Sequence, residues 1–360
     1  MAGWQGWHVA GSFAAGAAAA AAVRALLRHR ALSGAAALAT DSRWGEADAL
    51  QQFLLHIAPK LDGSAHKGQA GRIGVLGGSK DYTGAPYYTG QAALSVGADL
   101  LYLFTAEEAC NPIKSYSPEL MVTPVYSAKW PEGEERGVEA MVAAVVETLP
   151  RLHSLVIGPG LGRDEAVLRA VGQILLAAKE RQLPIVIDAD GLWLVTQQPE
   201  LVRGCASVIL TPNKIEFARL REALGVGAEG SAEDTLKAVC AALGGVTVLQ
   251  KGPVDLISDG GGLLSCDMPG GPRRSGGLGD VLAGTLGICN AWASMAAADG
   301  AGGDAPWAGQ EQLWAAWAAC AIVRASCGAA FARHRRATTA VHVLEELGAV
   351  FEGHCPAAAL

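Results

Sequence analysis

The sequence offers no recognisable cluster of metal ligands. Its eight cysteines are scattered, with no Cys-x-x-Cys pair and no Cys/His grouping at metal-ligand spacing, which argues against structural zinc. Scattered cysteines are typical of a reducing compartment, where a free thiol packs as a small apolar group. We expect Cys320 and Cys327, seven residues apart on one helix face, to be packing residues and not a redox pair.

Charged residues are also scarce, at 18% against 51% hydrophobic. This composition excludes a disordered chain and supplies a sizeable core. The first acidic residue is Asp41, so all 35 Asp and Glu lie after residue 40, together with 25 of the 28 Lys and Arg, for a formal charge of −10 there. Proteins that bind nucleic acid rely on a basic surface, so the acidic body argues against that class.

The N-terminal region lacks an apolar run long enough to cross a bilayer. Residues 9–23 are apolar but mostly Ala, and they fall short of the ~20 residues required. The charged start of a secretory signal is missing too. Residues 1–40 contain 16 Ala and three Arg without any acid, a composition that fits an organelle transit peptide. A disordered tail of a cytosolic protein and a secretory leader are the alternatives.

These features predict the organisation of the chain. We expect an N-terminal targeting or disordered segment over residues 1–60, one domain over residues 61–352 and a tail over residues 353–360. The expected location is the chloroplast or the mitochondrion, with the cytoplasm as the alternative, and no membrane partner is expected.

Strands and helices are predicted to alternate through most of the domain. The segment 72–105 has the pattern of a strand, a glycine turn, a helix and a second strand. Further apolar runs of strand length occur at 155–157, 185–187 and 208–210, separated by helical patterns at 164–180, 190–197 and 213–224. This alternation is typical of a parallel sheet covered on both faces, with ligands at the carboxyl ends of its strands.

The pattern changes after residue 245. Short strands are predicted at 246–250, 254–258 and 262–266, joined by glycine-rich turns, which indicates an antiparallel extension at one edge of the sheet. Three helices are then predicted, at 278–295, 310–332 and 340–352.

The most informative segment precedes the first of these helices. It reads Arg273-Arg274-Ser275-Gly276-Gly277-Leu278-Gly279-Asp280. Glycines allow the backbone to direct successive N–H groups at one point, and a helix that starts near Leu278 adds the positive end of its dipole. Such a turn can hold a phosphate, and Asp280 could accept a proton from a hydroxyl aimed at that phosphate. A glycine-rich loop with a helix-capping acid is the simpler interpretation.

With these motifs the chain resembles the ATP- or ADP-dependent NAD(P)H-hydrate dehydratases of the ribokinase-like superfamily, over about residues 60–350. The matching motifs, in order, are Gly68-Gln69-Ala70-Gly71-Arg72 with Gly77-Gly78-Ser79, Tyr82-Thr83-Gly84-Ala85-Pro86, Gly97-Ala98-Asp99, Tyr116-Ser117-Pro118-Glu119, Gly158-Pro159-Gly160-Leu161-Gly162, Asp188-Ala189-Asp190-Gly191, Thr211-Pro212-Asn213 through Glu216, and Gln250-Lys251-Gly252. The eukaryotic branch is the most similar, because His66-Lys67 precedes the first motif and paired Arg precedes the last.

The resemblance implies a fold and an activity. The fold is a three-layer α/β/α ribokinase-like fold with a mostly parallel central sheet and an antiparallel edge extension. The activity is repair of hydrated NADH and NADPH: the S epimer of NADHX or NADPHX is dehydrated in an ATP-dependent reaction that phosphorylates the C6 hydroxyl and then eliminates phosphate. ATP and Mg²⁺ are the implied cofactors, and an NAD(P)HX epimerase is the implied functional partner. A homo-oligomeric state stays open.

The resemblance also assigns roles to residues. Asp280 is the implied catalytic base, and the N–H groups of Gly277 and Gly279 hold the transferred phosphate. Glu216 is the implied contact to a magnesium-bound water. The implied hydrate-binding residues are Gly162, Asn213, Lys214, Ile215, Glu216, Phe217, Ala218, Arg219 and Asp280, with Gly97 as a weaker match. The implied ATP-binding residues are Lys251, Gly252, Pro253, Val254, Asp255, Arg273, Arg274, Ser275, Gly276, Gly277, Leu278 and Gly279.

Some of these positions have simpler interpretations. Asn213 with Glu216 three residues later is close to a helix capping box, and Lys251 alone could be a surface residue. The family's eukaryotic branch usually has Gln where this chain has Leu278, so a side-chain hydrogen bond to the nucleotide is lost while the backbone N–H remains.

Three other functions share part of this sequence pattern. The glycines at 74–78 and 158–162 do not have the spacing of a dinucleotide fingerprint, which disfavours a classical dehydrogenase. A ribokinase-like kinase for a small molecule would use Asp280 in the same way, and a non-catalytic nucleotide-binding protein is the third hypothesis. The motifs at 68–72 and 82–86 favour the dehydratase, because they lie outside the general phosphate-binding machinery.

Overall fold

The computed structural model describes residues 46–130, 133–300 and 305–357. The chain divides into two units, Met1–Ala49 and Leu50–Leu360. The predicted transit peptide in residues 1–40 lies outside the described residues. The second unit begins earlier than the expected residue 61, because helix α2 (Glu46–Ile57) buries Phe53 and Leu54 completely. The ring of Phe53 contacts that of Trp307, with centroids 5.5 Å apart, so residues from 50 onward are part of the core.

A single sheet of nine strands organises the second unit, in the order β3-β2-β1-β4-β5-β6-β7-β8-β9. All neighbours from β3 to β7 are parallel, and β8 and β9 add antiparallel pairs at one edge. The strands are β1 (Arg72–Leu76), β2 (Leu100–Ala106), β3 (Leu120–Tyr126), β4 (Ser154–Ile157), β5 (Ile185–Ile187), β6 (Val208–Leu210), β7 (Thr247–Gln250), β8 (Asp255–Ser258) and β9 (Leu263–Cys266).

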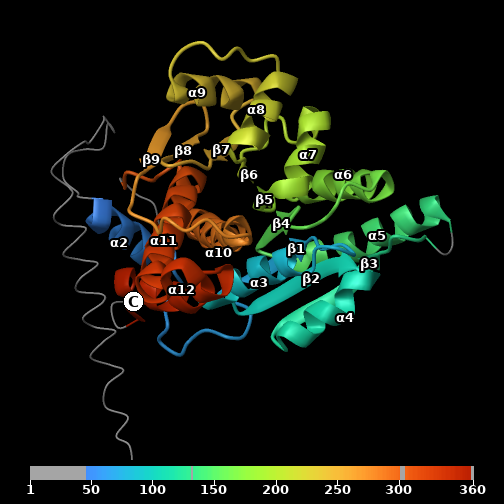
Figure 1. Cartoon of the computed structure of the whole chain (residues 1–360), viewed down its shortest axis with the longest axis horizontal. Helices are drawn as coiled ribbons and strands as arrows, with labels where there is room; N and C mark the ends of the chain where they lie inside the picture. The colour runs from blue at the N-terminus through green and yellow to red at the C-terminus, as the bar shows by residue number, and fades with distance from the viewer. Residues whose placement is uncertain (1–45, 131–132, 301–304, 358–360) are drawn as a thin grey trace, which may run out of the picture. The chain divides into compact units, whose positions relative to one another are not determined.

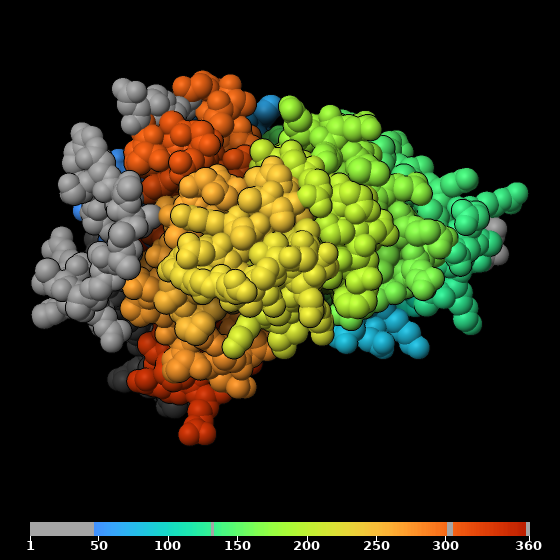
Figure 2. Space-filling view, turned by 90° about the horizontal axis from the view of Figure 1, so that it is seen from above, coloured from blue at the N-terminus to red at the C-terminus, as the bar shows by residue number. Residues whose placement is uncertain are grey.

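Helices cover both faces of this sheet (Figure 1). One layer holds α3 (Gly84–Val96), α4 (Glu107–Tyr116), α10 (Leu278–Ala298), α11 (Glu311–His334) and α12 (Ala340–His354). The other layer holds α5 (Glu134–Thr148), α6 (Glu165–Glu180), α7 (Ala189–Gln197), α8 (Lys214–Ala223) and α9 (Ala232–Ala242). Figure 2 looks onto this second layer, where the yellow atoms of α8 and α9 border the green atoms of α6 and α7.

This arrangement follows from the handedness of parallel crossovers. The chain moves from β1 outward to β3 and then returns to add β4 on the opposite side of β1. Because β-α-β connections are right-handed, reversing the direction of travel moves the helices to the other face. The predicted three-layer architecture, with a mostly parallel sheet and an antiparallel edge, is therefore confirmed.

Helix α10 is the central element of its layer, and it packs closely because its residues are small. A Cβ atom added to Gly284 would overlap the carbonyl oxygen of Thr89 in α3, so the two helices approach backbone to backbone. Most of α10 and α11 is buried inside the protein; both are long and apolar enough to cross a membrane by composition, a test that buried core helices also pass.

The eight cysteines lie in described residues, seven of them buried and Cys327 half-buried. Cys320 and Cys327 both lie on α11, as predicted. Burial raises the pKa of Cys289 to about 12 and that of Cys327 to about 11. These groups are therefore thiols at neutral pH, which fits their role in packing.

The close crossing of α3 and α10 gives the first prediction. Gly284→Ala should lower the free energy of unfolding by about 3 kcal/mol, because the new methyl group forces two backbones apart. Gly172→Ala is the matched control: its Cβ would lie 3.7 Å from Leu201, an ordinary contact, and α6 should gain up to about 1 kcal/mol of helix propensity. Urea unfolding of both variants measures the difference. Equal stability of the two would show that the crossing tolerates a side chain.

Candidate active site

The candidate site lies at the carboxyl ends of the parallel strands, where helix α10 begins. Strands β1 and β4 are neighbours, and the chain leaves them toward opposite sides of the sheet. In open α/β sheets such a switch point opens a crevice at the carboxyl ends of the strands, where ligands bind. The glycine turns after β1 and β4 meet there, since the N–H of Gly78 donates to the carbonyl oxygen of Pro159 at 2.9 Å.

A buried ion pair lies at the centre of the site. Asp188 follows β5, and its Oδ1 accepts hydrogen bonds from Lys251 Nζ at 2.6 Å and Thr211 Oγ1 at 2.8 Å. Burial alone would lower the pKa of Lys251, but the negative charges of Asp188, Glu216 and Asp280 raise it above its ordinary value. Lys251 is therefore a fixed cation at neutral pH, available to a phosphate.

The turn that carries Asp188 also positions a second carboxylate. Ala189 has a φ of 47°, a left-handed conformation that is unfavourable for alanine and occurs most often at functional sites. Beyond this residue Asp190 turns toward the loop after β4. Its Oδ2 accepts the N–H of Gly162 at 2.9 Å, and its Oδ1 accepts Nε of Arg163 at 3.1 Å. The N–H of the predicted hydrate-binding Gly162 is thus already used within the protein.

The start of α10 is shaped as a site for an anion. Gly277 is the N-cap, with a φ of 89°, and a Cβ there would lie 2.8 Å from atoms of Ala340 and Tyr88, so only glycine fits. The first intrahelical bond runs from the N–H of Val281 to the carbonyl oxygen of Gly277 at 3.0 Å. The preceding N–H groups are therefore available to bind a negative charge, and the helix dipole favours one.

Asp280 lies in the first turn of α10 beside the ion pair. A Cβ added to the preceding residue, Gly279, would lie 3.6 Å from Lys251 Nζ and 3.8 Å from Asp188 Oδ2. Burial, reinforced by the negative charge of Asp188 and opposed by Lys251, raises the pKa of Asp280 to about 7. A carboxylate with a pKa near neutrality is well suited to act as a general base.

Asn213 and Glu216 form the capping box that the sequence suggested. Asn213 Oδ1 accepts the N–H groups of Ile215 and Glu216, and Glu216 Oε2 accepts the N–H of Asn213 at 2.8 Å. Burial raises the pKa of Glu216, which also interacts electrostatically with Lys251 and Asp188. The Glu216 carboxyl group therefore lies close enough to the Lys251–Asp188 ion pair to interact with a ligand bound at that pair. Among the described residues no group of three His, Cys, Asp or Glu side chains could hold a metal ion alone.

The other residues predicted to bind the nucleotide differ in their surroundings. Asp255 Oδ1 accepts the N–H of Gly252 at 2.8 Å, and its Oδ2 accepts Nε of Arg324 at 2.6 Å. Asp255 therefore shapes the turn after Lys251, with both oxygens already engaged. Arg273 and Arg274 are exposed, whereas the Ser275 hydroxyl is buried and has no partner among the described residues.

Two predicted hydrate-binding residues lie apart from the site surface. Phe217 is 6% exposed and belongs to the core. Gly97 caps the C-terminus of α3, against the ring of Trp292, at the amino ends of the strands. Asp99, two residues further on, donates its N–H to Gly71, which immediately precedes β1. The structure thus does not bring Gly97 to the other site residues, because Gly97 lies at the amino ends of the strands and the site lies at their carboxyl ends.

Sequence reasoning gave no role to Asp188, Thr211, Asp190 or Arg324. The first three stand in motifs that directly follow strands β5 and β6, and that position was the available signal. Arg324 lies in the interior of α11, and nothing in its local pattern indicates the turn that it supports.

Comparison with known proteins identifies the family. A family model described as NAD(P)H-hydrate dehydratase matches residues 73–348. The chain belongs to the NAD(P)H-hydrate dehydratase family. Its relatives include the ATP-dependent (S)-NAD(P)H-hydrate dehydratase of Bos taurus, 47% identical over 84% of this chain and 88% of the relative. The protein of the same name from Arabidopsis thaliana is 40% identical over 91% of both chains.

Solved structures agree on the fold. A ribokinase-like superfamily protein from Enterococcus faecalis superposes with a TM-score of 0.68 at 20% identity, covering 87% of this chain and 96% of that one. The ADP/ATP-dependent NAD(P)H-hydrate dehydratase of Bacillus subtilis, co-crystallised with ATP/Mg²⁺, gives a TM-score of 0.60 at 21% identity, covering 84% and 97%. The predicted ribokinase-like fold is confirmed.

The raised pKa of Asp280 predicts a pH-dependent cost in stability. Because its pKa in the folded protein, about 7, exceeds the ordinary aspartate value of 3.8, the native state binds this proton more tightly, and stability falls as pH rises from about 4 to about 7. Asp280→Asn removes this loss. The variant should match wild type near pH 4 and unfold at a higher temperature at pH 8. A melting-temperature difference that is constant from pH 4 to pH 8 would contradict the shift.

Proposed function

We propose that this protein repairs hydrated nicotinamide cofactors: it uses ATP to dehydrate the S epimers of NADHX and NADPHX and so restores NADH and NADPH. The relatives that share 40–47% of its residues over most of the chain are named for this reaction. The observation in the structure that carries the proposal is the position of Asp280. It is a carboxylate with a pKa of about 7, in the first turn of α10, whose glycine N-cap leaves N–H groups open to an anion, and it lies beside the fixed cation Lys251.

The reaction begins with proton transfer to Asp280. As the carboxylate takes the proton of the C6 hydroxyl, the hydroxyl oxygen attacks the γ-phosphorus of ATP, the bond to the β-phosphate oxygen breaks, and ADP leaves. Negative charge on the transferring group is stabilised by the N–H groups at the start of α10 and by Lys251. The phosphate then leaves C6 with the electron pair of its C–O bond, and loss of a proton from C5 restores the ring double bond.

Mg²⁺ is part of the proposal. In phosphoryl-transfer sites this ion is bound by substrate phosphates, waters and only one or two carboxylates, and Glu216, half-buried beside the ion pair, provides one carboxylate of this kind. Glu216 would contact the ion through water. When bound, Mg²⁺ would neutralise charge on the nucleotide phosphates.

The proposal extends to the setting of the reaction. The Ala-rich, acid-free composition of residues 1–40 supports a location in the chloroplast or the mitochondrion. An NAD(P)HX epimerase would supply the usable epimer. Burial of α10 and α11 within the core supports a protein without a membrane partner.

An assay with purified protein tests the function. Incubation with NADHX and ATP should restore the absorbance of NADH with one ADP formed per NADH. Asp280→Asn should reduce kcat at least about 100-fold, the contribution of a positioned base, while circular dichroism stays unchanged. Retention of more than a tenth of wild-type activity would remove Asp280 from this role, and ADP formation with a phosphorylated product but no NADH would indicate a kinase.

The pH dependence of the reaction tests the electrostatics. Because Asp280 must be ionised to accept a proton, kcat/KM for NADHX should fall below about pH 7. Lys251 lowers the pKa of Asp280, so Lys251→Met should move this acidic limb to higher pH as well as reduce the rate. Lys60→Met, at an exposed lysine outside the site, is the control. An acidic limb at the same pH in Lys251→Met and wild type would show that Asp280 is not the group that titrates.

A further inference from the structure

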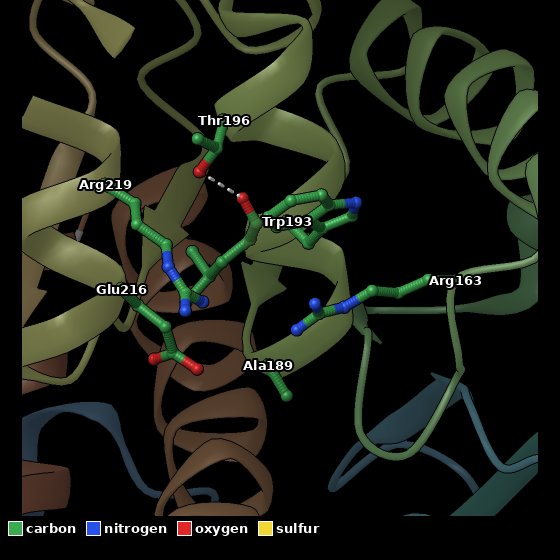
Figure 3. Close-up of a pocket in the computed structure, with 7 residues that line it drawn as sticks. Arg163, Ala189, Trp193, Thr196, Glu216 and Arg219 are labelled. Carbon is green, nitrogen blue, oxygen red and sulfur yellow. Dashed lines mark hydrogen bonds between the residues drawn. The ribbon is translucent and has the colours of Figure 1, made fainter. Parts of the chain in front are cut away.

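A hollow lies beside the reacting centre, between the loop after β4 and helices α7 and α8. Figure 3 shows Arg163 and Arg219 entering it from opposite sides, with Trp193 and Thr196 from α7 above them in this view. The residues that line it are Arg163, Ala189, Leu192, Trp193, Thr196, Glu216 and Arg219. Of these only Glu216 and Arg219 belong to the segment predicted to bind the hydrate.

Arg163 is held in a fixed orientation. Asp190 accepts a hydrogen bond from its Nε at 3.1 Å, and its guanidinium carbon lies 4.5 Å from the centre of the Trp193 ring. Contact with an aromatic face and a carboxylate on the Nε edge orient the planar group without using its terminal nitrogens. These terminal nitrogens form the pair that binds phosphate oxygens in a bidentate manner.

Arg219 carries a charge that no neighbour neutralises. Within the described part of the chain it makes no hydrogen bond or ion pair. Glu216 lies three residues earlier on α8, a spacing that favours an ion pair, but its Oε2 accepts the N–H of Asn213. Arg219 lines the hollow together with Arg163, and because no described side chain pairs with its guanidinium, that group is available to an external anion.

We propose that Arg163 and Arg219 form a phosphate subsite for the dinucleotide part of the hydrate. This inference rests on the proposed function, because NADHX carries a diphosphate and NADPHX carries the diphosphate and a 2′-phosphate. The hollow adjoins the reacting centre through Glu216, which lines it and interacts with Lys251 and Asp188. A phosphate bound there belongs to the same molecule as the reacting ring. Asp190 is a positioning residue, since it holds both Arg163 and the N–H of Gly162.

Substitution of the two arginines tests the subsite. Arg163→Gln and Arg219→Gln should each raise KM for the hydrate at least about 10-fold, the equivalent of one charge-assisted contact, with kcat within about two-fold of wild type and KM for ATP unchanged. Both side chains are exposed, so the fold should persist. Arg136→Gln, at an exposed arginine of α5, is the matched control and should leave every constant unchanged.

The two hydrates distinguish the sources of the phosphate. An equal rise of KM for NADHX and NADPHX identifies the diphosphate, and a rise for NADPHX alone identifies the 2′-phosphate; either result supports the subsite. Unchanged KM values, or a fall in kcat without a change in KM, overturn it.

A binding measurement separates this proposal from the function on which it rests. Calorimetric titration with (S)-NADPHX in the absence of ATP should show binding to wild type and at least about 10-fold weaker binding to Arg163→Gln. If wild type binds the hydrate but does not convert it, the function fails while the subsite is judged by the variant. If wild type converts the hydrate and the variant binds it equally well, the subsite fails while the function stands.

Discussion

The ion pair between Lys251 and Asp188 is the interaction on which the site depends. It joins the carboxyl ends of β5 and β7, and both side chains are largely removed from water. Breaking such a pair from one side leaves an uncompensated buried charge, at a cost of about 3–5 kcal/mol. The same pair sets the charge around Asp280, because Asp188 raises the pKa of that carboxyl group and Lys251 lowers it. Stability and proton transfer therefore depend on the same two groups.

The strained turn at Ala189 extends this arrangement across the site. Its left-handed backbone allows Asp188 and Asp190 to serve different partners: Asp188 holds the cation of the reacting centre, and Asp190 holds Arg163 and the loop after β4. A three-residue segment thus connects the phosphoryl-transfer chemistry with the hollow beside it. If residues 188–190 began a regular helix, helix geometry would fix the directions of both carboxylates. One of the two contacts, with Lys251 or with Arg163, would then be lost.

Much of the fold could be predicted from the sequence, because strand-length apolar runs with turns behind them are local signals. The motif containing Asp280 is local as well. Helix α2 was assigned to the targeting segment, since its partner Trp307 lies far away in the sequence. Strand β3 contains Pro124 and lies at the sheet edge, so its sequence gives only a weak signal for a strand. Asp188 and Asp190 appear in the sequence as one motif, and only the positive φ of Ala189 reveals that they face different groups.

The negative net charge of the protein beyond residue 40 constrains how it binds its two anionic substrates, ATP and the hydrated dinucleotide. A net charge of −10 beyond residue 40 provides no long-range attraction for a nucleotide, and at physiological ionic strength charges more than about 8 Å apart are largely screened. Binding must therefore come from groups in direct contact with phosphate. The N–H groups at the start of α10 and Lys251 serve the transferred phosphate. A hydrated dinucleotide carries further phosphates remote from its reacting ring. Arg219, which has no partner within the described part of the chain, lines the hollow beside the reacting centre together with Arg163 and can supply positive charge in direct contact with one of them.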